Sequence, residues 1–255
     1  MPEHMTAPVL IIGIHRSGTS LLTRMLEAIG LFVGNDLQAD HESLIMIQIN
    51  NKYFDITNSS WDQPAYPAAH PDGENYIAEI LSANAELIAE RFGTTADFWG
   101  FKDPRTLTTL PYWLKTFPDA KVVYIRRSPQ DIARSLTSRH QRNIKKGLFP
   151  PHGSFTISGV KFTQRCATME GSMSFVMEQH AFYENLLKNG VIQKHLELSY
   201  EELLHDPVFQ LSRLCRYLEC TVDRKRTLEA ANMPNCQRTM DAKLAFETYF
   251  GNKKP

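Results

Sequence analysis

The chain has 255 residues, of which 42% are hydrophobic and 10% aromatic, and its 28 Lys and Arg residues balance 28 Asp and Glu residues. This composition is that of a folded globular protein, and it excludes a disordered tail or a collagen-like chain. Zero net charge removes any global attraction to nucleic acid or anionic membranes, so an anion-binding site has to be local. Because no linker interrupts the sequence, we expect one domain over residues 1–255.

The cysteines lack the spacing of a metal site or of a disulfide framework. They form no CxxC pair and no Cys/His array. The four are Cys166, Cys215, Cys220 and Cys236. We expect reduced thiols and no bound metal. The most apolar early stretch, residues 9–14, is too short for a signal peptide or a membrane span, so we expect a cytoplasmic protein without an integral membrane segment.

The first expected element is a strand that runs into a glycine-rich turn and a helix. Residues 9–14 form a short apolar run, the turn GIHRSGTS covers residues 13–20, and apolar residues then follow at helical spacing up to Gly30. A strand, a glycine-rich turn and a helix in this order are typical of the start of a nucleotide-binding α/β domain.

Strands and helices alternate along the rest of the chain. A helix is predicted over residues 77–88, closing at Gly93, and strands over 98–102, 121–126 and 195–200. Pro129 predicts a helix start after the middle strand, and two helices follow the last one. The alternation predicts an α/β fold with a mostly parallel central sheet flanked by helices. Residues 141–175, with Pro150 and Pro151 and little periodicity, predict an irregular loop or lid.

The turn at residues 13–20 has the pattern GxxxxG followed by Thr19 and Ser20. It matches a phosphate-binding loop, except that Thr19 replaces the usual lysine after the second glycine. Such a loop binds an anion through backbone N–H groups at a helix N-terminus. Arg16 would supply the cation from inside the loop, and its guanidinium can donate two hydrogen bonds to an oxyanion.

A second basic motif follows the strand over residues 121–126. Arg126 and Arg127 end this strand, and Ser135 lies about two turns into the next helix. Residues 121–146 contain eight basic residues and one acidic residue, Asp131. The eight are Lys121, Arg126, Arg127, Arg134, Arg139, Arg142, Lys145 and Lys146. An anion is therefore expected to bind nearby, although a solvated basic helix is an alternative for residues 139–146.

These motifs, in this order, resemble those of the sulfotransferase family. Residues 13–20 resemble its 5′-phosphosulfate loop, and KVVYIRRSPQDIARSL at 121–136 resembles its 3′-phosphate motif. The segment from Leu198 to Pro207 resembles the family's "YEdl…dP" stretch. The resemblance implies a bacterial-type enzyme with a P-loop NTPase-like fold. It also implies the donor 3′-phosphoadenosine-5′-phosphosulfate, the product adenosine 3′,5′-bisphosphate, and no required metal.

The resemblance also implies roles for individual residues. The loop residues Arg16, Ser17, Gly18, Thr19 and Ser20 would hold the 5′-phosphosulfate. Arg127 and Ser135 would hold the 3′-phosphate, and Tyr200 would lie near the adenine, a core tyrosine being the alternative. The chain departs from the cytosolic eukaryotic members in having Arg16 where they have lysine. Their C-terminal Arg-Lys-Gly segment is also missing, and Arg238 is a substitute candidate.

Four residues are candidates for catalysis. Arg16 would stabilise the bridging oxygen, and Lys102, in a GFKDPR stretch that resembles the KDPR of bacterial-type members, would face the sulfuryl group or the acceptor. The alternative for this stretch is that Asp103 caps the next helix and pairs with Arg105. Related sequences have a glutamate near the position of Glu42, which is the first candidate for the general base, with His41 second. The alternative for Glu42 is a first-turn carboxylate of the following helix.

The sequence thus predicts a sulfotransferase that acts on a hydroxyl of a carbohydrate, lipid or small metabolite. The alternatives are a P-loop small-molecule kinase, which would need an acidic metal ligand where this chain has two arginines, and a nucleotide-binding protein without catalysis. The acceptor would be selected by residues 141–175 and 61–71. In the latter stretch, Trp61, Tyr66 and His70 either stack on a ring of the acceptor or pack the loop onto the sheet.

Overall fold

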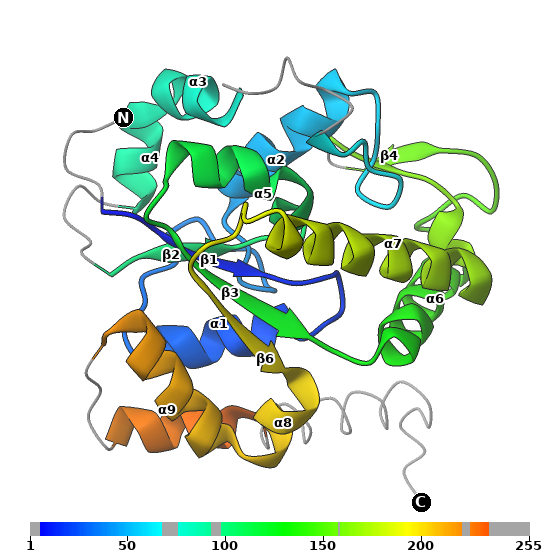
Figure 1. Ribbon diagram of the computed structural model, residues 1–255. Helices are drawn as coiled ribbons and strands as arrows, with labels where there is room; N and C mark the ends of the chain where they lie inside the picture. Colours follow the sequence, from blue (N-terminus) through cyan, green and yellow to red (C-terminus); the bar gives the residue numbers. More distant parts are fainter. Residues whose placement is uncertain (1–5, 68–75, 93–97, 158, 221–224, 235–255) are drawn as a thin grey trace, which may run out of the picture.

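A parallel four-stranded sheet with the order β2-β1-β3-β6 forms the centre of the molecule (Figure 1). The computed structural model describes residues 6–67, 76–92, 98–157, 159–220 and 225–234. Leu10 pairs with Phe101 on one side and with Val122 on the other. The strands are β1 (Val9–Ile12), β2 (Gly100–Lys102), β3 (Lys121–Arg126) and β6 (His195–Ser199). This sheet and its flanking helices confirm the predicted α/β fold.

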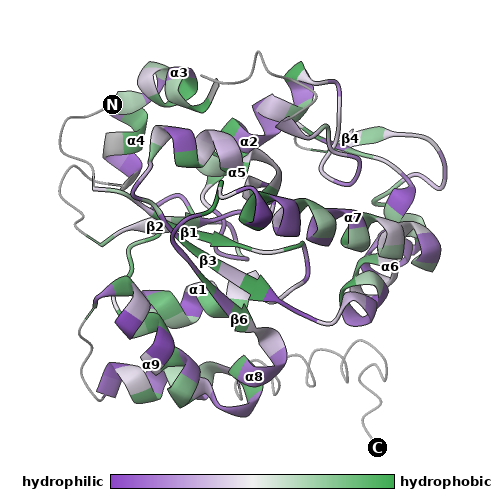
Figure 2. Cartoon of the chain, viewed as in Figure 1, coloured by the Kyte–Doolittle hydropathy of each residue, from purple (hydrophilic) through white to green (hydrophobic). Residues whose placement is uncertain are grey.

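Helices cover both faces of the sheet because both faces of its strands are apolar. Along β1, Leu10 and Ile12 belong to one buried cluster, and Val9 and Ile11 belong to the other. Figure 2 shows hydrophobic residues along the central strands. The larger cluster includes α2 (Leu44–Ile56), α3 (Tyr76–Ala83), α4 (Ala85–Phe92), α5 (Thr106–Thr116), α6 (Pro129–Lys145) and α7 (Met169–Lys188). The smaller one includes α1 (Thr19–Ala28), α8 (Tyr200–His205), α9 (Pro207–Leu218) and the helical residues 225–234.

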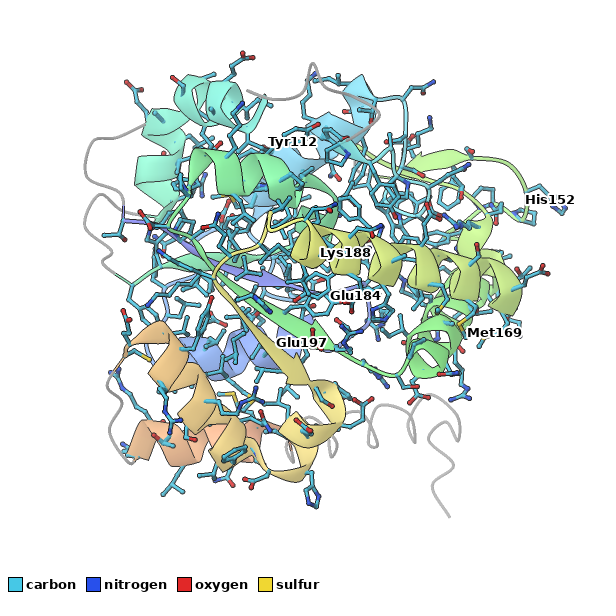
Figure 3. The ribbon with its side chains drawn as sticks, viewed as in Figure 1. Tyr112, His152, Met169, Glu184, Lys188 and Glu197 are labelled. Atoms are coloured by element: carbon cyan, nitrogen blue, oxygen red, sulfur yellow. The ribbon has the colours of Figure 1, made fainter. Side chains whose placement is uncertain are left out.

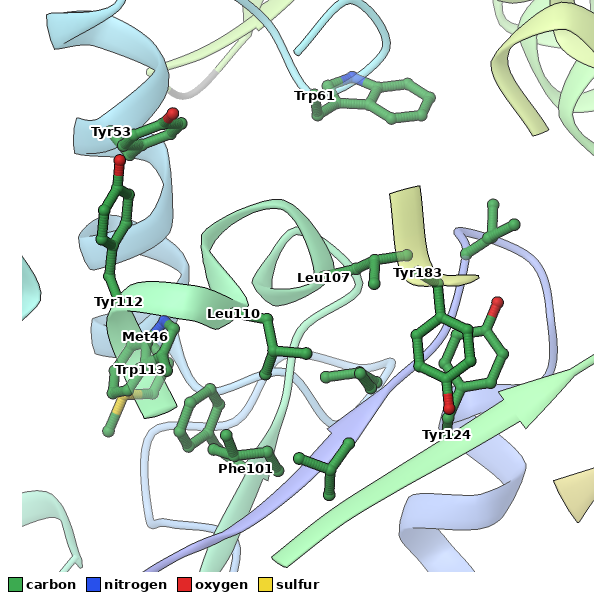
Figure 4. Packing of buried hydrophobic residues seen from close by; sticks show 14 of the residues in the cluster. Met46, Tyr53, Trp61, Phe101, Leu107, Leu110, Tyr112, Trp113, Tyr124 and Tyr183 are labelled. Carbon is green, nitrogen blue, oxygen red and sulfur yellow. The ribbon is translucent and has the colours of Figure 1, made fainter. Parts of the chain in front are cut away.

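The larger core is aromatic and is connected to the end of β2. The rings of Tyr124 and Tyr183 lie face to face (Figure 4), and their centroids are 3.7 Å apart. The indole of Trp113 donates a hydrogen bond of 3.1 Å to Asn50 Oδ1, and Asn50 Nδ2 donates one of 2.8 Å to Asp103. Asn50 is fully buried, so its amide links the core to the polar motif that follows β2.

The two consecutive arginines after β3 have different partners. Arg126 Nε lies 2.5 Å from a carboxylate oxygen of Glu197 on β6, and its Nη2 lies 2.5 Å from Glu184 on α7. Both glutamates are labelled in Figure 3. The hydrogen bonds that Arg126 donates to these carboxylates raise the pKa of its guanidinium. Arg126 therefore links β3 to β6 and α7, whereas Arg127 contacts the turn after β1.

Two expected elements differ from those observed. The helix expected over residues 77–88 is divided into α3 and α4 at Asn84, whose side chain donates to Ile80 O. Gly93 lies outside the described residues. Residues 141–175 are not one irregular loop, because they contain the end of α6, the hairpin of β4 (Phe155–Ile157) and β5 (Val160–Phe162), the short helix η3 (Arg165–Ala167) and the start of α7.

Side-chain hydrogen bonds explain why this region is ordered despite its weak periodicity. The carboxylate of Asp62 accepts hydrogen bonds from the backbone N–H and the hydroxyl of Thr163, just after β5. The Thr168 hydroxyl caps α7 by accepting from the Gly171 N–H at 3.1 Å. Thr163 lies 101 residues after Asp62 in the sequence, so local patterns do not reveal this contact.

The cysteines of the described residues are free thiols. Cys166 is buried, and burial raises the pKa of its thiol to about 12. Cys215 and Cys220 are half-buried, and Cys236 lies outside the described residues. In the part of the chain that the structure describes, no helix is both long and apolar enough to cross a membrane.

We predict that Leu10→Ala lowers the free energy of unfolding by about 2–5 kcal/mol, because it leaves a cavity at the centre of the sheet. Leu10 is fully buried, whereas Leu148 is 61% exposed and provides the matched control Leu148→Ala. Chemical denaturation of the two variants measures the difference. Equal losses of stability would contradict this placement of the core.

Candidate active site

The turn after β1 has the backbone geometry of an anion-binding loop. The Ser17 N–H donates to Ile14 O at 2.9 Å, and Arg16 and Gly18 have φ values of 73° and 106°. Helix α1 begins at Thr19, and no side chain caps its N-terminus. The first N–H groups of a helix have no acceptors within the helix, and they carry its positive partial charge. The loop is therefore able to bind an anion through its backbone.

Glycine is required at both ends of this loop. A Cβ at Gly18 would lie 2.3 Å from the ring of Tyr200, in addition to the positive φ there. A Cβ at Gly13 would lie 2.9 Å from the carbonyl oxygen of Ile125. The loop is thus packed directly against the end of β3 and the start of α8.

Residues from three separate motifs meet at this loop. Arg127 Nη1 donates to Arg16 O at 3.1 Å, and the Arg127 guanidinium lies 4.6 Å above the Tyr200 ring. The Arg127 Nε is buried without a hydrogen-bond partner in the described part of the chain. Arg16 Nε donates to Ser135 Oγ at 3.1 Å. The structure therefore brings together four residues that the resemblance assigned to the donor site: Arg16, Arg127, Ser135 and Tyr200.

A buried carboxylate with two cationic partners lies beside the loop. Glu42 is 6% exposed; its Oε1 accepts from Lys102 Nζ at 2.9 Å and its Oε2 accepts from Arg105 Nη2 at 2.7 Å. Lys102 Nζ also donates to Ser20 Oγ at 3.3 Å. Burial raises the pKa of Glu42 and Asp103 adds to the effect, while Lys102 and Arg105 oppose it. Glu42 faces these cations and does not serve as a first-turn carboxylate of α2, whose N-cap is Ser43.

The motif after β2 combines both of its sequence interpretations. Lys102 contacts Ser20 and Glu42, as expected for a residue of the site. Asp103 accepts hydrogen bonds from the backbone N–H and the Nε of Arg105, so the expected pairing of these two residues is also present. However, the N-cap residue of α5 is Arg105 and not Asp103. The pair fixes the guanidinium that holds Glu42.

These groups surround a cavity of about 310 Å³, hereafter the first cavity. Five cationic side chains and two carboxylates line it, so its surroundings favour an anion. The cations are Arg16, Arg24, Lys102, Arg127 and Arg139, and the carboxylates are Asp40 and Glu42. Its wall also includes Gly18, Thr19, Ser20 and Tyr200.

Three of the predicted site residues do not line this cavity, namely Ser17, His41 and Ser135, of which Ser135 contacts Arg16 Nε beside it. Ser17 is fully buried, and its backbone N–H donates a hydrogen bond to Ile14 O, so Ser17 stabilises the turn. His41 Nδ1 lies 2.5 Å from Glu27 Oε2, a contact that turns its ring toward α1. Of the two candidates for the base, Glu42 is the one whose carboxylate lines the cavity.

Sequence reasoning missed His15 and Arg139, which both line the first cavity. The His15 ring lies 4.5 Å from that of Trp61, and the Arg139 guanidinium lies 5.3 Å from the same indole. The alternative of a solvated basic helix over residues 139–146 fits the exposed Arg142 and Lys145 but not Arg139, which lines the cavity. Arg139 lies one turn after Ser135 on α6, and this spacing could have revealed it.

The aromatic residues of the 61–71 stretch pack against different partners. Trp61 is 4% exposed and packs against Phe162 and Phe175, so it supports the loop as expected and also borders the site. Tyr66 packs on Phe182 instead. His70 and Arg238 lie outside the described residues. Among the residues that are described, no group of three His, Cys, Asp or Glu side chains is placed to hold a metal ion.

We predict that His15 makes the fold sensitive to acid. Burial, together with Arg105 and Arg139, lowers the pKa of His15 well below its usual value, so the folded protein disfavours the imidazolium. The unfolded chain takes up this proton near pH ~6.5, so folding stability is lost below that pH, by up to about 1.4 kcal/mol per pH unit. Denaturation of wild type and His15→Gln from pH 7.5 to 5 measures the difference. A parallel decline in both proteins would contradict the prediction.

The family and the fold are supported by comparison with known proteins. The model of the sulfotransferase family matches residues 8–224. The sulfotransferase STF1 from Mycobacterium tuberculosis is 17% identical, with a TM-score of 0.52 over 91% of this chain and 73% of that one. A sulfotransferase from Alicyclobacillus acidocaldarius is 18% identical, with a TM-score of 0.51 over 86% and 83% of the two chains. A comparison with curated proteins finds no match. The family match over most of its length shows that the chain belongs to the sulfotransferase family.

Proposed function

We propose that this protein transfers a sulfuryl group from 3′-phosphoadenosine-5′-phosphosulfate to the hydroxyl of a small-molecule, lipid or carbohydrate acceptor. One observation carries the proposal: the anion-binding loop, Lys102 and the buried carboxylate of Glu42 all border one cavity, and Arg127 lies on the same wall. These are the groups that the reaction needs, namely a site for the donor's anions, a cation at the reacting centre and a base. The proposal treats the chain as one sulfotransferase domain.

The residues of the loop fit the donor's two anionic ends. In the proposal, the uncapped N-terminus of α1, with Gly18, Thr19 and Ser20, holds the 5′-phosphosulfate, and the buried Ser17 keeps the loop in shape. Arg127 and Ser135 hold the 3′-phosphate, and the unpartnered Nε of Arg127 supplies a donor for it. Tyr200, packed between Gly18 and Arg127, contributes a ring surface for the adenine.

The transfer needs one proton acceptor and stabilisation of the leaving group. The donor supplies an activated sulfuryl group whose bond to the 5′-phosphate oxygen breaks as a bond to the acceptor oxygen forms. Glu42 takes the hydroxyl proton, and its raised pKa makes it a stronger base than an exposed glutamate. Lys102 and Arg16 stabilise the negative charge that develops on the bridging oxygen. The bisphosphate leaves with the bonding electrons, so charge and atoms balance.

A kinase or a catalytically inactive nucleotide-binding protein would use the same fold differently. A kinase would need a carboxylate for Mg²⁺ near the phosphates, whereas β3 is followed here by Arg126, which is held by Glu197, and by Arg127. An inactive protein would bind the donor without converting it. Ligand binding and turnover therefore distinguish the three functions.

We predict that adenosine 3′,5′-bisphosphate raises the melting temperature and that ATP with Mg²⁺ does not. A ligand that binds only the folded state stabilises it by about 2.7 kcal/mol at 100 times its dissociation constant. Arg127→Ala should abolish most of this stabilisation, because it removes the guanidinium that faces the loop. Arg142→Ala, an exposed change on α6, is the control. Preferential stabilisation by ATP with Mg²⁺ would replace the sulfotransferase proposal with the kinase.

We predict that Glu42→Gln lowers turnover by about 10²- to 10⁴-fold, which is the usual effect of losing a general base. Binding of the bisphosphate should persist. Turnover is followed as release of the bisphosphate from the sulfated donor with a panel of phenols and alcohols. Because the pKa of Glu42 is raised, wild-type turnover should fall on the acid side at a higher pH than for an ordinary glutamate, and the variant should lose this dependence. Asp55→Asn, which changes an exposed carboxylate of α2 that lines neither cavity, is the control. Full turnover in Glu42→Gln would remove Glu42 from the mechanism.

A further inference from the structure

A second cavity, of about 510 Å³, opens onto the first one. Four residues line both cavities: His15, Asp40, Glu42 and Arg139. A molecule in the second cavity therefore lies next to Glu42, which lines both cavities. If the proposed function holds, on which this inference rests, the second cavity is where the acceptor binds, and its wall shows which chemistry the acceptor has.

Part of the lining of the second cavity is apolar. It is formed by Trp61, by Val160 and Phe162 of the hairpin, and by Leu44 and Ile47 of α2. The Trp61 and Phe162 rings meet edge to face with centroids 5.8 Å apart. Rings held in this way present a rigid surface for a planar ring or a short acyl chain. The apolar part of the acceptor is therefore expected on this apolar lining.

Polar atoms without partners border the same space. Among the described residues, Trp61 Nε1, Asn51 Oδ1 and His15 Nε2 are buried and make no hydrogen bond. Trp61 is 4% exposed, so its N–H has lost water as a partner. Burying such atoms without a hydrogen bond costs free energy, and a bound ligand with polar groups offsets that cost. The cavity therefore also suits polar atoms of a ligand.

Arg139 is the charged residue of this cavity that has no counterion in the part of the chain that the structure describes. Its guanidinium lies 5.3 Å from the Trp61 ring, and it makes no ion pair or hydrogen bond with the described residues. The other charged residues that line the cavity are paired: Glu42 binds Arg105, and Asp40 Oδ2 lies 4.0 Å from Lys102 Nζ. Burial and the neighbouring Arg16 disfavour the charge of Arg139 and lower its pKa. A half-buried cation without a carboxylate partner is stabilised by an anionic ligand.

We propose that the acceptor is a small hydroxy acid whose carboxylate binds Arg139, whose apolar body lies against Trp61 and Phe162, and whose hydroxyl faces Glu42. In this arrangement Arg139 determines specificity and Glu42 carries out the proton transfer. The competing role for Arg139 is a contact with the sulfuryl oxygens of the donor, since it lines the first cavity too. The two roles differ in which ligand a change of Arg139 affects.

Binding of matched probes to the protein saturated with adenosine 3′,5′-bisphosphate tests the proposal without requiring turnover. The probes are 3-(4-hydroxyphenyl)propanoate with its amide, and 8-hydroxyoctanoate with its amide. In at least one pair the acid should bind wild type about tenfold or more tightly than the amide, the usual effect of a charge-assisted hydrogen bond. Arg139→Gln should remove this preference, and Arg139→Lys should keep part of it. Arg142→Gln, an exposed change on the same helix, should behave as wild type.

The outcomes separate this inference from the proposed function. If the bisphosphate does not bind wild type, the proposed function fails first. If it binds and neither acid is preferred over its amide, the acceptor class is wrong while the donor site stands. If Arg139→Gln weakens binding of the bisphosphate, or slows turnover of acids and amides equally, Arg139 acts on the donor and the proposal is overturned. Melting curves without ligand show that each variant folds.

Discussion

The candidate site depends on the ion pairs that hold Glu42 between Lys102 and Arg105. All three side chains are buried, so the loss of one would leave an unbalanced charge, which costs about 3–5 kcal/mol in such settings. The pairs also fix the carboxylate in one orientation. Through Asp103 and Asn50, Arg105 is connected to Trp113, so Glu42 is linked to the buried core by a chain of hydrogen bonds.

The sheet brings these groups to one edge because parallel strands end on the same side. The loop follows β1, Lys102 ends β2, and Arg126 ends β3 with Arg127 directly after it. Consecutive side chains on a strand point in opposite directions. This explains why Arg126 binds glutamates of β6 and α7 while Arg127 contacts the loop, although the two residues are neighbours in the sequence.

The sequence was sufficient to predict the sheet and the loop, because both depend on local patterns, whereas Glu42 was proposed from the family resemblance. No site role was assigned to Arg139 or His15, because both meet Trp61 only through packing between α6, the turn after β1 and the loop that carries Trp61. The order of residues 141–175 was missed for the same reason: Asp62 fixes it from outside the segment. Long-range contacts between polar side chains leave no periodic pattern in a single sequence.

The two cavities differ in how their charge is balanced. In the first, the cations outnumber the carboxylates, and the uncapped α1 adds positive partial charge, so its surroundings suit several anionic groups. In the second, two arginines and two carboxylates are equal in number, but Glu42 binds Arg105 and Asp40 lies 4.0 Å from Lys102, so Arg139 is left without a carboxylate partner among the described residues. Holding His15 neutral costs stability in acid, and a half-buried Arg139 without a counterion costs stability at any pH. Proteins retain such unfavourable groups mainly at functional sites, so this arrangement supports placing the proposed donor and acceptor on the surface that the two cavities share.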